Sequence, residues 1–389
     1  MQLESPETAK ERDEELDDRE AYRFGKPPEV PSIEPAPETR QTEYSGVELR
    51  AIDLAKRSDR TAFIDVADGI YASDPHYIAP LRMHLMKFLD PAKNPAFKNL
   101  ELRAIIAYVG GKPVGRMTAH VDRNYNEYHQ SKSGFFGWFE CIDDKKVAHA
   151  MISDGVEFLR GRGAEEMYGP MNFSTNHQCG LLVENFDRPP FVEETYNLSY
   201  YEALFTSYGF GKAKDLLVWW IEVENGLTGK NRERINRIAE KIRKREGINF
   251  RHVSLQDAAR EKERIFDIYL AAWQKNWGFV PISKEEFMFL AADLEMVLIP
   301  ELFLFAEVEG KPVGFCGTLP NINEVLPRDG RLFPFAWWRF LTKRKKVKTA
   351  RLYTLGVIPE YRKRGLESVM FVETVLRANA IGIHRGEIG

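Results

Sequence analysis

The stretch LGVIPEYRKRGLESVM, residues 355–370, predicts a strand, a basic loop and a helix in direct succession. The residues up to Ile358 are apolar and β-branched, as is typical of a buried strand, and Pro359 ends it. Beyond Gly365, leucine, valine and methionine recur at the spacing of a buried helix face. We therefore expect a helix to begin at this glycine.

The loop before this helix has the composition of an anion site, since it contains Arg362, Lys363 and Arg364. The first backbone N–H groups of a helix carry the positive end of its dipole. Gly365 would let a ligand approach these groups closely. The pattern favours a phosphate ligand, although an ordinary strand, turn and helix with a solvated basic turn has the same composition.

The stretch resembles motif A of the GNAT acyltransferases, in which Arg or Gln, two residues, Gly, one residue and Gly or Ala bind the pyrophosphate of acyl-CoA. Arg362 and Gly365 match this pattern, whereas Glu367 stands where the family has a small residue. A carboxylate there would repel a bound pyrophosphate. The resemblance implies acyl-CoA as co-substrate, no permanently bound cofactor and no metal. The residues implied to bind the donor are Leu355, Val357, Arg362, Lys363, Arg364, Gly365, Leu366 and Ser368.

An internal repeat extends the resemblance over most of the chain. Residues 102–121 and 302–321 each read as a strand, a turn with Gly-Lys-Pro-Val-Gly and a second strand, which predicts two β-hairpins. The segments 69–80 and 267–281 before them also correspond. We therefore predict an α+β fold with two tandem GNAT-like domains, each a mixed, mostly antiparallel sheet flanked by helices. The predicted parts are a disordered acidic, proline-rich tail (1–45), a degenerate GNAT-like domain (46–225), a helical connector (226–249) and a GNAT-like acyl-CoA-binding domain (250–389).

The two predicted domains differ where the donor would bind. In the first, the apolar segment 134–142 leads into a helix that starts at Asp143 and Asp144, which cap a helix well but would repel phosphate. We expect this half to serve as a scaffold or as a wall of the acceptor site. The second half reaches only HRGEIG, where the fifth strand of the family should begin. We therefore expect this copy to be incomplete and to lack that strand, the helix after it and the closing hairpin.

The candidate catalytic residues lie in the first half. The polar loop 168–190 contains His177, which could accept a proton, although a histidine bonded to its own loop explains it equally well. The segment 199–224 resembles the family's later helix and closing strands. Phe205 occupies the position of its frequent general-acid tyrosine, which makes Tyr201, one turn earlier, the substitute. A tyrosine on such a helix is also an ordinary core residue.

Further candidates lie in the second half. Asn276 and Trp277 follow its first helix, where GNAT folds build the acceptor pocket. Residues 331–348 combine large aromatic side chains with cations, and 331–364 carry a net charge of +10. This composition favours contact with an anionic membrane surface. Attraction of nucleic acid, which we consider the weaker reading, and a solvated basic extension are the alternatives.

Composition agrees with a cytoplasmic protein, peripheral at the inner face of the membrane if residues 331–348 bind lipid. The 389 residues are 43% hydrophobic, contain no run of eighteen apolar residues and begin with a charged segment unlike a signal peptide. Residues 1–45 carry a net charge of −7, so the rest of the chain is mildly basic. Cys141, Cys179 and Cys316 lack metal-ligand spacing, which favours reduced thiols.

The leading hypothesis is an N-acyltransferase that moves an acyl group from acyl-CoA directly to a primary amine. The aromatic and basic insertion favours a long-chain donor or a lipid amine. In that respect the chain resembles the GNAT-type bacterial ceramide synthases, which acylate a sphingoid base. Two alternatives stay open: an aminoacyl-tRNA-dependent transferase of tandem-GNAT type, and a non-catalytic adaptor on a degenerate GNAT scaffold. The sequence predicts no particular oligomeric state.

Overall fold

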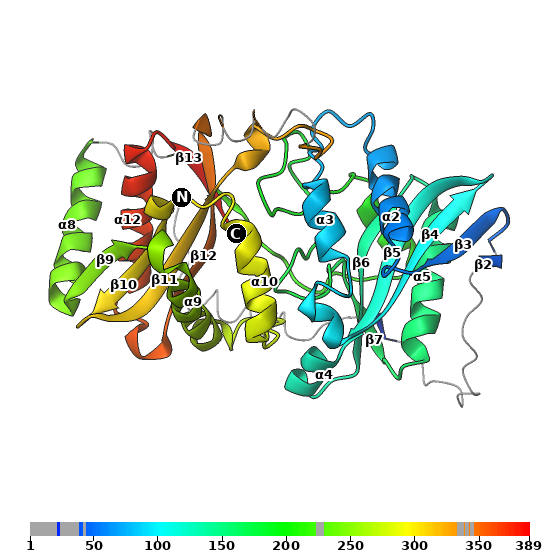
Figure 1. Cartoon of the computed structure of the whole chain (residues 1–389), viewed down its shortest axis with the longest axis horizontal. Helices are drawn as coiled ribbons and strands as arrows, with labels where there is room; N and C mark the ends of the chain where they lie inside the picture. The colour runs from blue at the N-terminus through cyan, green and yellow to red at the C-terminus, as the bar shows by residue number, and fades with distance from the viewer. Residues whose placement is uncertain are drawn as a thin grey trace. The chain divides into compact units, whose positions relative to one another are not determined.

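The computed structural model describes residues 22–23, 39–41, 44–222, 229–332, 338, 342 and 346–389. Most of the predicted tail 1–45 and most of the insertion 331–348 lie outside these residues. The chain forms two compact units that are discontinuous in sequence (Figure 1). Unit 1 contains Met1–Ser73, Phe97–Phe186 and Thr195–Leu216; unit 2 contains Asp74–Ala96, Asp187–Glu194 and Leu217–Gly389.

Unit 1 is built on a mixed sheet whose order, within the described residues, is β1-β7-β6-β5-β4-β3-β2. Its neighbouring strands are antiparallel except for β6 and β7, which are parallel. The strands are β1 (Tyr22–Arg23), β2 (Thr39–Gln41), β3 (Val47–Ile52), β4 (Leu100–Val109), β5 (Lys112–Asp122), β6 (Ser133–Cys141) and β7 (Glu166–Tyr168).

Helices cover both faces of this sheet. Successive side chains of β5 point to opposite faces, so neighbouring residues of this strand contact helices on opposite sides. Arg116 faces α2 and donates to the Phe63 carbonyl oxygen at 2.9 Å. The next residue, Met117, lies in the core with Met151 of α5. Tyr201 and Leu204 of α6 join the same core. The helices of unit 1 are α2 (Arg57–Ile70), α4 (Arg123–His129), α5 (Lys145–Arg160) and α6 (Tyr201–Tyr208).

Unit 2 repeats this plan with a sheet whose order, among the described strands, is β8-β13-β12-β11-β10-β9. Here β12 and β13 are the parallel pair. The strands are β8 (Trp219–Glu222), β9 (Ile248–His252), β10 (Phe303–Val308), β11 (Lys311–Pro320), β12 (Thr349–Val357) and β13 (Arg385–Ile388).

The helices of unit 2 also lie on both faces of their sheet (Figure 1). Cys316 of β11 packs beneath α12, where its thiol lies 3.2 Å from the Thr374 hydroxyl. The preceding Phe315 lies on the other side, in the core that Ile268 of α9 joins. The helices are α3 (Arg82–Phe88), α8 (Gly229–Glu246), α9 (Ala258–Trp273), α10 (Lys284–Leu294) and α12 (Leu366–Ala380).

The predicted repeat is confirmed in detail. The hairpins β4–β5 and β10–β11 have the same turn, and the register of each shifts at the equivalent place, between Ala107 and Tyr108 and between Ala306 and Glu307. Each shift marks a β-bulge beside the glycine that ends Gly-Lys-Pro-Val-Gly. The strand, loop and helix predicted at 355–370 are confirmed as β12 and α12, with Gly365 as the N-cap of α12.

Two expectations about the strands are corrected. The expected loss of the fifth strand is wrong, because Arg385–Ile388 form β13 in parallel register with β12. The segment is short and contains a glycine, so it has no strand pattern of its own and depends on neighbours at both edges. One neighbour is β8, which the sequence analysis placed in the first half but which pairs with β13 in unit 2. The predicted boundaries 46–225 and 250–389 stay a prediction.

Gly137 provides a test of the packing of unit 1. A Cβ atom at this position of β6 would lie 2.0 Å from the Met171 carbonyl oxygen. We expect Gly137→Ala to lower the free energy of unfolding by about 3 kcal/mol, because backbone cannot yield as a flexible side chain can. Gly69→Ala is the matched control: no atom lies within 4 Å of the added Cβ, and the helix should gain about 0.5–1 kcal/mol. Urea unfolding measures both, and equal midpoints would contradict the close packing.

Candidate functional site

The basic loop, defined here as residues 358–365, joins β12 to α12. Lys363 and Gly365 have positive φ angles of 60° and 85°, the left-handed conformation of concave backbone turns that bind anions. The Val369 N–H group donates to the Gly365 carbonyl oxygen at 3.2 Å and so begins the bonding ladder of α12. The N–H groups of the residues before Val369 therefore have no carbonyl of the helix to bond, as at any helix N-terminus. This geometry suits an anionic ligand.

The basic loop is held from several sides. The Arg362 guanidinium donates to the Val357 carbonyl oxygen at 3.0 Å and also to the Ala272 carbonyl oxygen. It thus ties the loop to the end of α9, and its predicted contact with pyrophosphate stays a prediction. On the other side, Arg245 of α8 donates to the Arg364 carbonyl oxygen at 2.9 Å. Lys363 and Ser368 are exposed, while Leu366 is buried in the core.

One edge of β12 leads directly to the basic loop. β13 pairs with β12 only over Thr349–Leu352. From Tyr353 to Val357, the described strand that pairs with β12 is β11, on the opposite edge. The β11 register passes from Thr354 to Leu352, so Tyr353 is the extra residue of a β-bulge. This five-residue edge is where an extended ligand arm could lie against the strand backbone.

The predicted acceptor residues lie in the turn after α9. Asn276 and Trp277 are exposed, and the Asn276 N–H group donates to the Trp273 carbonyl oxygen at 2.9 Å. The Trp273 ring crosses β12 so closely that a Cβ on Gly356 would lie 2.1 Å from it. The α9 end, the β12 edge and the basic loop therefore belong to one region of unit 2.

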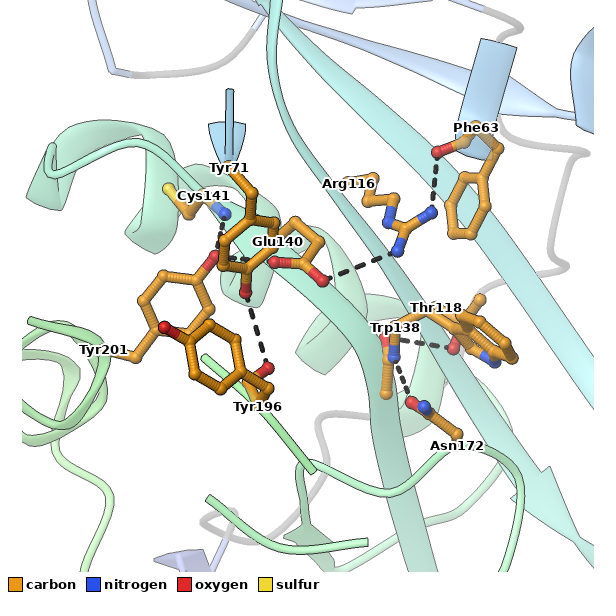
Figure 2. Close-up of polar contacts among 11 residues, drawn as sticks. Phe63, Tyr71, Arg116, Thr118, Trp138, Glu140, Cys141, Asn172, Tyr196 and Tyr201 are labelled. Atoms are coloured by element: carbon orange, nitrogen blue, oxygen red, sulfur yellow. Dashed lines mark hydrogen bonds and ion pairs between the residues drawn. The ribbon is translucent and has the colours of Figure 1, made fainter. Parts of the chain in front are cut away.

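In the equivalent region of unit 1 the chain bonds to its own strand edge, as Figure 2 shows for Trp138 and Asn172. The side-chain oxygen of Asn172 accepts from the Trp138 N–H group at 2.7 Å, and the Met171 N–H group donates to the Phe136 carbonyl oxygen at 2.7 Å. At the start of α5, the Asp144 carboxylate accepts from the Lys146 N–H group at 2.7 Å. Two backbone donors that a ligand could use in unit 1, the N–H groups of Trp138 and Lys146, are thus bonded to protein groups.

A buried polar network lies beside this region, between β5, β6 and α6 (Figure 2). The Tyr201 hydroxyl donates to the Glu140 carboxylate at 2.8 Å and accepts from the Cys141 N–H group at 3.0 Å. The Arg116 guanidinium lies 3.5 Å from the same carboxylate. Glu140 and Arg116 were not predicted from the sequence, although a charged residue within an apolar strand could have marked each of them.

Burial sets the protonation of this network. Burial, followed by the charge of Glu140, raises the pKa of Tyr201 well above its usual value of 10. Burial also raises the pKa of Glu140, and the Arg116 charge and the Tyr201 hydrogen bond offset part of this rise. Tyr201 therefore keeps its proton at neutral pH and lies in the core, as expected of an ordinary core tyrosine. Its role as a proton donor stays a prediction.

His177 lies in the polar loop of unit 1, where its Nδ1 atom is 3.1 Å from the Ser174 hydroxyl and its ring meets Phe173 edge-on. These contacts fit a loop-stabilising histidine, and its role as a base stays a prediction. The two predicted catalytic residues thus belong to unit 1, and the predicted binding residues to unit 2.

In the part of the chain that the structure describes, no group of acidic, histidine and cysteine side chains could hold a metal ion. No helix of that part could span a membrane.

The bacterial ceramide synthase of Caulobacter vibrioides (strain NA1000 / CB15N) is 31% identical to this chain over 352 residues, 88% of this chain and 90% of that protein. The chain belongs to the family of this ceramide synthase, and its fold is two tandem GNAT-like domains. Protein YghO of Escherichia coli (strain K12) is 33% identical over 309 residues, 79% of this chain and 78% of that protein. No family model matches the chain.

Solved structures similar to this GNAT-type chain include a tandem GNAT protein from the clavulanic acid biosynthesis pathway. It is 10% identical with a TM-score of 0.47, and the match covers 88% of this chain and 89% of that one. A GCN5-related N-acetyltransferase from Sphaerobacter thermophilus is 12% identical with a TM-score of 0.44, over 88% and 86% of the two chains.

Tyr201→Phe tests whether this tyrosine is a structural core residue or a proton donor. The variant removes the hydroxyl that donates to the buried Glu140 carboxylate and that accepts from the Cys141 N–H group, so we expect the free energy of unfolding to fall by about 1–3 kcal/mol. Tyr208→Phe is the control on the same helix, where the hydroxyl meets Ser153 at 3.2 Å in a half-buried place and the loss should be smaller. A turnover rate that falls more than about 100-fold in folded Tyr201→Phe would instead indicate a proton donor.

Proposed function

We propose that this protein is an N-acyltransferase that transfers an acyl group from acyl-CoA to a primary amine, with a lipid amine such as a sphingoid base as the acceptor. The observation that carries the proposal is the difference between the two units at equivalent places. In unit 1 the Trp138 N–H group is bonded to Asn172 and the helix start to Asp144. In unit 2 the corresponding strand edge leads to a glycine-capped helix and a basic loop.

The chemistry of this donor site is positioning and polarisation. The pyrophosphate would lie at the start of α12, near Lys363 and the first N–H groups of the helix, and the pantetheine arm along Tyr353–Val357. Strand N–H groups would polarise the thioester carbonyl. The amine nitrogen attacks the carbonyl carbon, the C–N bond forms, the C–S bond breaks and the CoA thiolate leaves with a proton. Holding the two reactants together supplies much of the acceleration.

Two observations support a lipid acceptor. The relative from Caulobacter vibrioides is called a ceramide synthase. In addition, unit 2 exposes large apolar side chains: Leu217 is 67%, Trp219 64% and Trp338 63% exposed. Residues 217–220 are all exposed, and soluble surfaces rarely expose such an apolar run without a partner.

The reaction itself is tested by incubating the protein with palmitoyl-CoA and sphinganine. We expect release of free thiol that depends on the amine, and an N-acyl product by mass spectrometry. Calorimetry with CoA alone tests the donor site. A protein that binds no CoA and instead retains tRNA on filters in a salt-dependent manner would be an aminoacyl-tRNA-dependent transferase, and one that binds neither would be an adaptor.

Lys363→Glu tests the basic loop. The reversed charge would face the pyrophosphate, so we expect CoA binding to weaken by about 1–3 kcal/mol at low salt. The loss should shrink as salt rises, because Lys363 is exposed and its charge is screened. Lys146→Glu makes the same change at the equivalent helix start of unit 1 and should leave the dissociation constant unchanged. If the two variants behave alike, the donor site does not lie in unit 2.

Membrane contact is tested by liposome flotation. Trp338 is exposed and cations surround it in sequence, so we expect binding to phosphatidylglycerol vesicles that weakens but persists in high salt. Replacing Trp337 and Trp338 together with Ser should remove the salt-resistant part. Tyr128→Ser removes an exposed aromatic ring of unit 1 and serves as the control. Wild-type protein that stays soluble beside these vesicles at low salt would refute membrane contact.

A further inference from the structure

A row of three residues crosses the sheet of unit 2 where its parallel pair lies. Arg351 of β12 is in register with Glu387 of β13, and Glu387 with Trp220 of β8. Residues in register point to the same face of a sheet. The next pair, Leu352 and Ile388, packs into the core beneath α8 and α12. The row of Arg351, Glu387 and Trp220 therefore faces the opposite side, the side of α9.

A short segment, residues 187–194, covers this row and is called the strap below. The Arg188 guanidinium lies 5.3 Å from the Trp220 ring centre, and Phe191 meets the same ring edge-on at 5.7 Å. Arg351 donates to the Val192 carbonyl oxygen at 3.2 Å. The strap is in turn bonded to Asn321, the residue just after β11, whose side-chain oxygen accepts from the Val192 N–H group at 3.2 Å. The strap thus adds two charged residues, Arg188 and Glu194, to the row.

Glu387 is the unusual member of this group. Its side chain is fully buried and pairs with the Arg351 Nε atom at 3.1 Å. Glu194 lies within hydrogen-bonding reach of it, and one Glu194 oxygen also accepts from the Phe191 N–H group at 2.7 Å. Yet neither carboxylate oxygen of Glu387 accepts a well-oriented hydrogen bond from the described residues. Burying a carboxylate without such bonds is costly, and residues of this kind are frequent at functional sites.

The position of Glu387 relates it to the proposed donor site. It lies one residue before the last β12–β13 pair, Leu352 and Ile388. Immediately beyond that pair, Tyr353–Val357 form the strand edge that leads to the basic loop. Beside it, Trp220 is 43% exposed, and β8 continues the apolar run that Leu217 and Trp219 begin. A carboxylate, an aromatic ring and an apolar strand thus adjoin the edge proposed to hold the thioester.

We propose that Glu387 is the catalytic base of acyl transfer and that it takes a proton from the ammonium group of the acceptor. The inference rests on the proposed function. Glu387 in its carboxylate form accepts the proton, which leaves the neutral amine with a lone pair. That nitrogen attacks the thioester carbon, CoA leaves as the thiol with the second nitrogen proton, and Glu387 returns its proton to water. The ring of Trp220 would attract the ammonium group of the acceptor as it binds. The exposed face of β8 suits the hydrocarbon chain of the acceptor.

The electrostatics agree with this role. Burial, and then the charge of Glu194, raise the pKa of Glu387 to about 7, while Arg351 and Arg188 lower it in part. A base with such a pKa is part ionised at neutral pH and can both take and return a proton. The charged groups that face it are Glu194 and Arg188 from the strap and Arg351 from β12.

The pH dependence of kcat/KM for palmitoyl-CoA and sphinganine tests this role. Wild-type activity should fall as the pH drops below about 7, because Glu387 becomes protonated. In Glu387→Gln, kcat should be about 10²- to 10⁴-fold lower. The variant should also lose the acidic limb of the profile, the fall in activity below about pH 7. Its affinity for CoA in calorimetry should be unchanged. Glu263→Gln is the matched control in unit 2, where Glu263 of α9 pairs with Lys284 at 2.7 Å and its side chain is 52% exposed, and it should keep the wild-type rate and profile.

A thermal unfolding series shows whether Glu387→Gln still folds. The pKa of Glu387 is raised by folding from about 4.5 to about 7. Its contribution to stability is therefore complete below pH 4.5 and is lost as the pH rises through 7. Glutamine has a similar shape and no charge, so at pH 8 the variant should melt no lower than wild type.

The outcomes distinguish the two proposals. Wild-type protein that neither binds CoA nor acylates the amine overturns both. Wild-type activity with an unchanged rate and acidic limb in Glu387→Gln overturns only the role of Glu387. Disappearance of that limb in His177→Gln, with Glu387→Gln unaffected, would identify the histidine as the base instead. Retained activity in Glu387→Asp together with loss in Glu387→Gln would support the carboxylate itself.

Discussion

The second sheet depends on one constraint, the pairing of β13 at both of its edges. Four residues with a glycine among them cannot hold an extended conformation alone, because an isolated short strand gains too little to offset its lost entropy. β12 supplies bonds at one edge and β8 at the other. These three strands come from residues 219–222, 349–352 and 385–388, so their pairing brings together segments far apart in the chain. The buried row of Arg351 and Glu387 exists only as a result of this pairing.

The two units show how one fold is used in two ways. Both have the same hairpin bulge and the same parallel pair that follows it. In unit 1, Asn172 saturates a strand N–H group with a carbonyl of the protein itself, and Arg116, Glu140 and Tyr201 fill the adjoining interior with a bonded network. Such saturation stabilises a structure but leaves no donor for a ligand. The second unit keeps the edge of β12 and the start of α12 in a form that suits a bound anion.

Local signals in the sequence predicted much of this fold. The glycine before α12, the apolar spacing of Leu366, Val369 and Met370, and the repeated Gly-Lys-Pro-Val-Gly turn each specify structure through nearby residues, and each prediction is confirmed. The strand β13 and the place of β8 in the second sheet were not predicted, because their pairing is decided by partners remote in sequence. Glu387 was not predicted, for a related reason. A glutamate near the end of a strand looks solvated until the residues that bury it are known.

The strap and α3 have a consequence for how the chain folds. Both are encoded in the first half, yet they belong to unit 2: Lys87 of α3 pairs with Asp293 of α10 at 2.8 Å, and the strap is bonded to Asn321, just after β11. While the chain is synthesised, these segments and β8 must wait for partners made much later. Contacts so distant in sequence slow folding and expose apolar surface in the meantime. Leu217 lies just before β8 and Trp219 begins it, so newly made chains would be a natural substrate for chaperones, and neither unit could be cut out as one uninterrupted segment.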